Sequence, residues 1–106
     1  MTPEGDIYQC HQFVGQPQFR MGSVHDEPIA LNACLTADFA ELMVPNKPAC
    51  MSCWSRYFCS GGCAANAYAA TGSVLGLYEI GCALQKKRLE CALWIKSRLM
   101  QDAQDL

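Results

Sequence analysis

Cysteine thiols are the side chains of this chain best suited to chemistry, because four of them are closely spaced and a fifth follows. The pattern is Cys50-x2-Cys53-x5-Cys59-x3-Cys63-x18-Cys82. Thiolates bind zinc and also hold iron–sulfur clusters, and two intervening residues let both sulfurs of a Cys-x-x-Cys pair reach one metal. The spacing therefore predicts a metal or iron–sulfur site in a cysteine-rich loop that one distant cysteine closes.

The oxidation state of these thiols depends on the cellular compartment. Residues 1–6 are polar and acidic, without the basic start and apolar run of a secretory signal. No apolar stretch of about 18 residues is present to span a membrane. We therefore expect a cytoplasmic protein without a membrane partner, whose thiols stay reduced and bind metal. The even number of cysteines, eight, also suits a disulfide-bonded secreted protein, an alternative that the missing export signal disfavours.

The choice between zinc and an iron–sulfur cluster is left open by the spacing alone. A thioredoxin-like dithiol would need its Cys-x-x-Cys at a helix start within a βαβ unit, and that setting is absent. Trp54, Tyr57 and Phe58 are bulky aromatic residues that would shield a cluster from water. They suit a hydrophobic core equally well, so both interpretations of the aromatic residues stay open.

Size and composition predict one small domain over residues 1–106. Hydrophobic residues make up 51% of the chain, so we expect a packed core rather than disorder. At this length burial alone gives marginal stability, and metal or covalent links commonly share in folding. The net charge of −2 lacks the basic excess that nucleic-acid binding requires, so no nucleic-acid partner is expected.

The elements that must position the cysteines follow from the hydrophobic pattern. It predicts an α+β domain in which an N-terminal β-hairpin precedes helices and a Cys-rich metal-binding loop. The hairpin covers residues 5–24, with strands at 7–10 and 19–24. A helix begins near Pro28 and ends before Pro45 and Pro48. Its apolar stripe consists of Leu31, Leu35, Phe39 and Leu42.

Two further helices are expected after the cysteine-rich loop. A short helix begins at Cys63, and residues 72–81 form a glycine-containing return loop. The last helix covers about residues 83–101 and keeps its basic residues, Lys86 among them, near water. One face of this helix carries Leu84, Ala92, Ile95 and Leu99.

Several stretches of the chain resemble one known protein family. The run from Cys50 to Cys63, CMSCWSRYFCSGGC, followed by Cys82, resembles the C-terminal SPASM domain of radical SAM enzymes, which holds two auxiliary [4Fe–4S] clusters. Residues 5–15, 19–24 and 81–92 are similar to a branch of that family that forms thioether crosslinks in ribosomally made peptides. This branch includes the SCIFF-peptide maturases and the quinohemoprotein amine dehydrogenase maturation proteins. The resemblance covers nearly the whole chain.

The resemblance implies ligands for both clusters. The outer cluster would be held by Cys50, Cys53, Cys59 and Cys82. Cys63 would cross over to the inner cluster, where Cys10 joins it. The family places another inner ligand where this chain has Glu27, and a further one before the hairpin. One [4Fe–4S] cluster is therefore expected, and a second only if neighbours complete the inner site. The candidates for completing it are His25, Asp26 and Glu27, each more often a solvated loop residue.

The resemblance also implies a function. The domain would position a Cys-rich ribosomally made precursor peptide and assist electron flow during thioether crosslinking. The chain lacks the Cys-x-x-x-Cys-x-x-Cys triplet and the length of a barrel, which takes roughly 200 residues or more. S-adenosylmethionine chemistry is therefore expected only from a separate radical SAM core domain or chain, and no catalysis from this chain alone. The alternative is a small structural zinc-binding module for protein interaction, in which Cys50, Cys53, Cys59 and either Cys63 or Cys82 hold one ion.

The remaining candidates have simpler interpretations. Cys34 and Cys91 border apolar faces and are expected to pack as small buried hydrophobes. His11 could donate a hydrogen bond to a cluster sulfur, although a structural or surface role is favoured. The basic run at 86–88 could meet an acidic peptide, although a solvated helix face is preferred. Arg20 and Arg56 could contact substrate or carboxylates.

Overall fold

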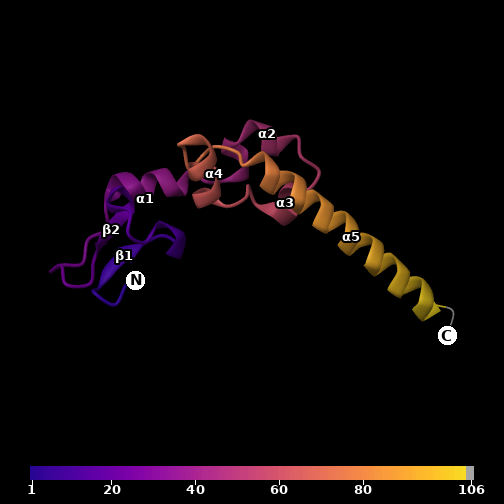
Figure 1. The fold of residues 1–106 in the computed structure, drawn as a ribbon, viewed down its shortest axis with the longest axis horizontal. Coiled ribbons are helices and arrows are strands. Elements are labelled where there is room, and N and C mark those ends of the chain that lie inside the picture. The colour runs from indigo at the N-terminus through magenta and orange to yellow at the C-terminus, as the bar shows by residue number, and fades with distance from the viewer. Residues whose placement is uncertain (105–106) are drawn as a thin grey trace.

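The chain forms an N-terminal hairpin followed by helices, which confirms the α+β class (Figure 1). A computed structural model describes the backbone of residues 1–104 and the side chains of residues 1–102. The hairpin end of the molecule contains β1 (Asp6–Tyr8), η1 (His11–Phe13), η2 (Pro17–Phe19) and β2 (Arg20–Ser23). The helical part contains α1 (Ala33–Ala40), η3 (Val44–Asn46), α2 (Pro48–Met51), α3 (Arg56–Cys59), α4 (Ala64–Thr71) and α5 (Glu79–Gln104).

The two strands pair in the antiparallel sense expected of a hairpin, but they are shorter than predicted. Asp6 pairs with Ser23 and Tyr8 with Arg20, and the register shifts after Ile7. An ion pair across the hairpin joins Arg20 Nε to Asp6 Oδ1 at 2.6 Å, and the Asp6 carboxylate raises the pKa of Arg20. The sequence predicts that residues 9 and 10 belong to the first strand, but β1 ends before them. The η1 and η2 turns occupy most of the connection between the strands.

Helix α1 begins at Ala33, five residues after the predicted start at Pro28. A capping side chain is available directly before Ala33. Asn32 is the N-cap residue, and its Oδ1 accepts a hydrogen bond from the backbone N–H of Leu35 at 3.1 Å. The prediction that Leu31 belongs to the apolar stripe of this helix is wrong, because Leu31 lies before the cap and is exposed. Phe39 is the member of the stripe that reaches the core.

The core is a small group of aromatic side chains between the hairpin end, α1 and α4. Phe13 is 1% exposed and stacks on Phe19 with ring centroids 4.2 Å apart. Tyr68 of α4 meets Phe19 edge-on at 4.7 Å, and Phe39 of α1 meets Phe13 at 5.6 Å. Edge-to-face contacts of this kind stabilise a core beyond the area they bury. This cluster fixes α4, and therefore the chain that precedes it, relative to the hairpin.

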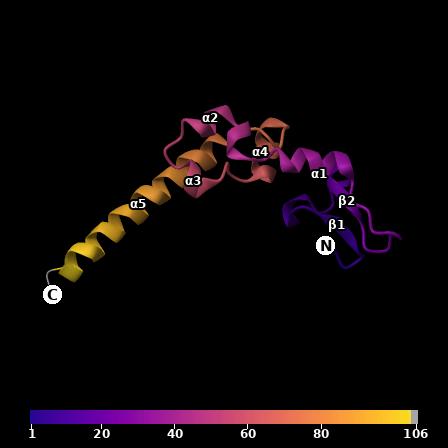
Figure 2. The ribbon, with the colours of Figure 1, turned by 180° about the vertical axis from the view of Figure 1, so that it is seen from behind.

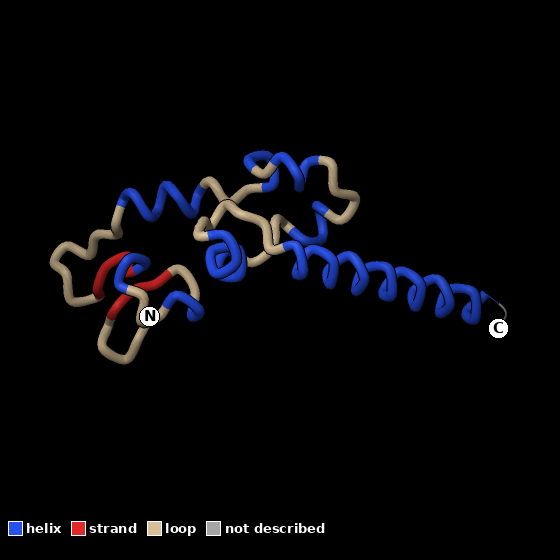
Figure 3. The backbone as a smooth tube through the Cα atoms, turned by 45° about the horizontal axis from the view of Figure 1, so that its top comes forward, coloured by secondary structure: helices blue, strands red, loops and turns tan. Residues whose placement is uncertain are grey.

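The cysteine-rich segment contains short helices where the sequence predicts a loop. One turn of helix, α2, carries Cys50, and another, α3, ends at Cys59. The predicted helix after Cys63 is confirmed as α4, and the predicted last helix is confirmed as α5, which begins earlier and ends later than expected. Figure 3 shows α2 and α3 as brief coils separated by loop, with α5 leaving this region as one long helix.

The molecule is elongated rather than compact. Its radius of gyration is 18.6 Å, whereas a compact chain of this length has about 13 Å. Figures 1 and 2 show that α5 extends away from the rest of the molecule, with the hairpin at the opposite end. The predicted apolar face of α5 is exposed, with Leu84, Ile95 and Leu99 each more than half accessible. Within residues 1–104, no helix combines the length and apolar character needed to cross a membrane.

Candidate metal centre

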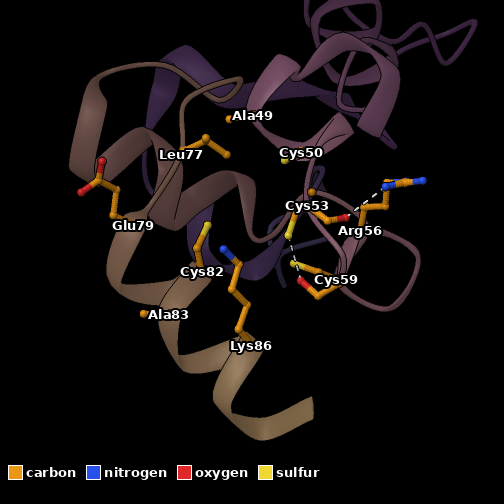
Figure 4. A pocket seen from close by; sticks show the side chains of 12 residues that line it. Ala49, Cys50, Cys53, Arg56, Cys59, Leu77, Glu79, Cys82, Ala83 and Lys86 are labelled. Carbon is orange, nitrogen blue, oxygen red and sulfur yellow. Dashed lines mark hydrogen bonds between the residues drawn. The ribbon is translucent and has the colours of Figure 1, made fainter. Parts of the chain in front are cut away.

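The four cysteines assigned to the outer cluster line one cavity of about 360 Å³. Three of them come from the segment that contains α2 and α3, and the fourth comes from the first turn of α5 (Figure 4). The ligand set is Cys50, Cys53, Cys59 and Cys82. All four are half-buried free thiols. The structure thus brings Cys82 to the same cavity as the three cysteines that are close together in the sequence.

Local backbone geometry explains why the segment from 47 to 62 curves around this cavity. Cys53 N–H donates to the carbonyl of Cys50 at 3.1 Å, which folds the Cys-x-x-Cys pair into a turn. After Cys59, Ser60, Gly61 and Gly62 all have positive φ values, of 55°, 87° and 80°. Glycine adopts this left-handed conformation without a Cβ clash, so the glycine pair allows the sharp reversal toward Cys63.

Arg56 holds the same segment from outside. Its Nη1 donates to the backbone carbonyls of Met51 at 3.1 Å and of Cys53 at 3.3 Å. Its guanidinium also lies over the ring of Tyr57, 4.6 Å from the centroid. The structure therefore gives Arg56 a role in shaping the cavity wall, whereas Arg20 pairs with Asp6 across the hairpin.

Ser55 makes a direct contact with one thiol. Its hydroxyl lies 3.1 Å from Cys53 Sγ, and the residue is only 2% exposed. Hydrogen bonds from the Ser55 hydroxyl and backbone lower the pKa of the Cys53 thiol, and the charges of Lys86 and Arg56 act in the same direction. The thiolate form, which is the form that binds metal, is favoured at this position.

Cys50 ionises less readily than Cys53. Burial raises the pKa of its thiol above the ordinary value, the charge of Lys47 opposes this rise, and the nearby thiols of Cys82, Cys59 and Cys53 add to it. Several thiols that repel one another's charge in this way are a suitable set for a cation, because metal binding removes the repulsion.

Lys86 faces the cavity, although the sequence suggests a position near water. It is half-buried, lines the cavity, and extends from α5 toward the sulfur atoms in Figure 4. Lys86 follows Cys82 by four residues, so both side chains lie on one face of the helix. The four-residue spacing from Cys82 could therefore have predicted from the sequence that Lys86 lies near the cavity. No comparable sequence pattern predicts the contacts of Ser55 and Lys47.

The size of the cavity tests which group the thiols fit. Four thiolates on one zinc ion stand about 3.8 Å apart, because each zinc–sulfur bond is about 2.3 Å long. In the described residues, no group of three or more His, Cys, Asp or Glu side chains is placed to hold a single metal ion. The cavity, which the four thiols line together with eight other residues, is roughly twenty times the ~15 Å³ that one water requires. The cavity that these four half-buried thiols line has room for a group larger than a single ion.

A second cavity, of about 530 Å³, lies next to the first. The two share the wall residues Cys59, Gly61, Leu77 and Cys82. Cys63 lines the second cavity and not the first, and its thiol donates a hydrogen bond to Gln12 Oε1 at 3.1 Å. Cys63 is therefore absent from the first cavity, shares the second with Cys59 and Cys82, and contacts Gln12, two residues after Cys10.

The predicted inner ligands are only partly brought together. Cys10 is half-buried, and its Sγ lies 3.8 Å from Nδ1 of His11, which is exposed. Asp26 accepts a hydrogen bond from the backbone N–H of Ser23 at 2.9 Å, so its carboxylate is engaged in the turn after β2. His25 and Glu27 are exposed on the same loop. Figures 1 and 2 place this loop at the end of the molecule opposite α5.

Five residues do not take the positions that the sequence suggests. Trp54, Tyr57 and Phe58 are 49%, 81% and 67% exposed, so they are not core residues, and none lines the cavity. Leu77, Ala49 and Ala83 provide its apolar wall instead. Cys34 and Cys91 are exposed rather than buried.

Comparison with known proteins adds no assignment. No model of a known protein family matches the chain, and no curated protein resembles it at a significant level.

Proposed function

We propose that this chain is an auxiliary [4Fe–4S]-binding domain of the SPASM type, with Cys50, Cys53, Cys59 and Cys82 as the cluster ligands. The observation that carries the proposal is their convergence on one cavity large enough for a multi-atom group. Three of the ligands are close in sequence, and the fourth comes from α5 after the intervening α4. The resemblance of the cysteine run to SPASM domains names the cluster, and the cavity independently supports the ligand set.

The residues of the chain divide the work of holding such a cluster. A bound [4Fe–4S] cluster supplies one-electron transfer and no proton chemistry of its own. Ser55 orients the Cys53 sulfur by its hydrogen bond, and Arg56 fixes the carbonyls of the turn before it. Leu77, which is half-buried, contributes apolar surface to the cavity wall. Lys86 places positive charge beside the thiolates, which balances part of their negative charge.

The wider role follows from the resemblance and belongs to the same proposal. The domain serves a radical SAM enzyme that forms thioether crosslinks in a Cys-rich ribosomally made peptide, and a separate core supplies S-adenosylmethionine cleavage. The domain positions the peptide and carries electrons. No residue of this chain is proposed to be catalytic.

Ligand substitution with a matched control tests the proposal. The chain, purified without oxygen or reconstituted with iron and sulfide, should be brown and hold about four irons and four sulfides. Cys82→Ser should lower both contents to less than half, because it removes a cavity ligand, whereas Cys34→Ser should leave them unchanged because Cys34 is exposed elsewhere. Colourless protein that binds one zinc per chain would overturn the cluster and support the zinc-binding alternative.

A further inference from the structure

Lys47 carries the only charge that is buried among the described side chains. It is 4% exposed, in a structure where even most hydrophobic side chains remain accessible. Burial of an ammonium group away from water is costly unless an anion or several hydrogen-bond acceptors compensate it. The buried position of Lys47 therefore requires a partner.

The interactions within the described residues compensate the buried ammonium of Lys47 only in part. Lys47 Nζ donates to the backbone carbonyl of Gly61 at 3.1 Å, while an ammonium has three protons to donate. The ion pairs recorded in residues 1–102 are Arg20–Asp6 and Lys87–Glu90, neither of which includes Lys47. Among the described side chains, no carboxylate thus forms an ion pair with Lys47.

The wall of the metal cavity lies against Lys47. Gly61, the hydrogen-bond acceptor of Lys47, lines the cavity, and a Cβ added to Gly61 would lie 3.5 Å from Lys47 Cδ. The lysine stem therefore packs behind this part of the wall. The carbonyl of Lys47 also accepts the backbone N–H of Cys50 at 2.8 Å, so the two residues are held in one turn. The charge of Lys47 acts on the Cys50 thiol, where it favours the thiolate.

We propose that Lys47 is a built-in counter-charge of the metal centre that raises the reduction potential of the cluster. This inference rests on the proposed function, because it requires a cluster in the cavity. A cluster bound by four thiolates is anionic, and reduction adds one further negative charge. A fixed cation behind the wall stabilises the reduced form more than the oxidised form. Because Lys47 is buried, water and salt screen this interaction less than they screen a surface lysine.

Three variants test the role of the charge. Lys47→Met removes the charge and keeps a side chain of similar length, whereas Lys47→Arg keeps the charge. Lys87→Gln is the surface control, because the Lys87 side chain is 74% exposed and pairs with Glu90 on α5. The midpoint potential of the reconstituted full-length chain is measured by redox titration with dithionite as the electron donor, followed by electron paramagnetic resonance.

The expected result is specific to Lys47→Met. This variant should lower the equilibrium constant for one-electron reduction about tenfold, which is about 59 mV toward negative potential. Lys47→Arg and Lys87→Gln should stay within about twofold of the wild type, a shift of roughly 18 mV. A potential of Lys47→Met equal to that of the wild type would overturn the proposal and leave the cluster assignment intact.

Loss of the cluster gives equally clear outcomes. If Lys47→Met holds no iron while Lys47→Arg does, the charge itself is required to hold the cluster, which supports the counter-charge, and the potential is then compared between Lys47→Arg and the wild type. If both variants lose iron, the packing of lysine rather than its charge matters, and the proposal fails. If the wild type itself holds no iron and sulfide, the proposed function fails and this inference fails with it.

Discussion

Cys50 and Cys53 lie three residues apart, yet their surroundings drive their thiols in opposite directions. Burial raises the pKa of Cys50, whereas the hydrogen bonds of Ser55 lower that of Cys53. In metal-free protein near neutral pH, a larger fraction of Cys53 is therefore thiolate, which is the reactive form. Iodoacetamide should modify Cys53 several-fold faster than Cys50, as measured by mass spectrometry of the digested protein. Equal rates would contradict the structure.

Removal of the Ser55 hydroxyl should make Cys53 less reactive. Ser55→Ala loses the 3.1 Å contact with Cys53 Sγ, so the pKa of Cys53 rises and its thiolate fraction near neutral pH falls. Alkylation of Cys53 should slow by at least about twofold. At a pH well above the pKa of both forms, the wild-type and variant rates should meet, because each thiol is then fully ionised. Ser52→Ala is a control, since the Ser52 hydroxyl bonds the carbonyl of Ala49 and no thiol. A constant rate difference at every pH would indicate a packing effect instead.

Among the helices, α1 depends on one capping side chain. Asn32 Oδ1 accepts the N–H of Leu35, and no other side chain caps this helix start. Asn32→Ala should reduce the free energy of unfolding by about 1 kcal/mol, whereas Asn32→Asp should retain most of the stability. Chemical denaturation of both variants under the same metal load measures the difference. A variant Asn32→Ala as stable as the wild type would show that packing of Phe39, rather than the cap, fixes α1.

The elements differ in how far the sequence predicts them. The hairpin, α4 and α5 are predicted because local patterns of turn residues and helix formers are strong enough to determine them. The start of α1 is not, because Asn32 and Pro28 are both acceptable starts and the choice depends on the local hydrogen bond. The single turns α2 and α3 are too short to produce a periodic pattern.

The residues of the candidate site also divide into those that the sequence predicts and those that it does not. Its cysteines are predicted from spacing, whereas the exposure of Trp54, Tyr57 and Phe58 depends on tertiary packing that no local pattern reveals. The burial of Lys47 is equally hidden, since lysine is among the residues least often buried.

For the whole molecule, the projecting end of α5 is separate from the cavities. The residues of α5 that line them end at Arg88, and the large apolar side chains from Leu93 to Met100 are exposed. A chain that ends at Glu90 should therefore bind the same iron and sulfide per chain as the full chain. A chain that ends at Ile80 lacks Cys82 and should lose most of it. Elemental analysis of both measures this, and loss of iron in the longer truncation would show that the end of α5 supports the site.

The position of Cys82 on α5 has a consequence for how the chain loses order. Metal held by Cys50 and Cys82 would cross-link a loop of about thirty residues, which restricts the unfolded chain much as a disulfide does. The aromatic group around Phe13 contains no cysteine, and its members Phe13 and Phe19 lie outside that loop, whereas Tyr68 lies within it. Chelation should therefore speed hydrogen exchange in the first turns of α5 and leave β1 and β2 protected. One half of the protein would then keep its order when the other half is released.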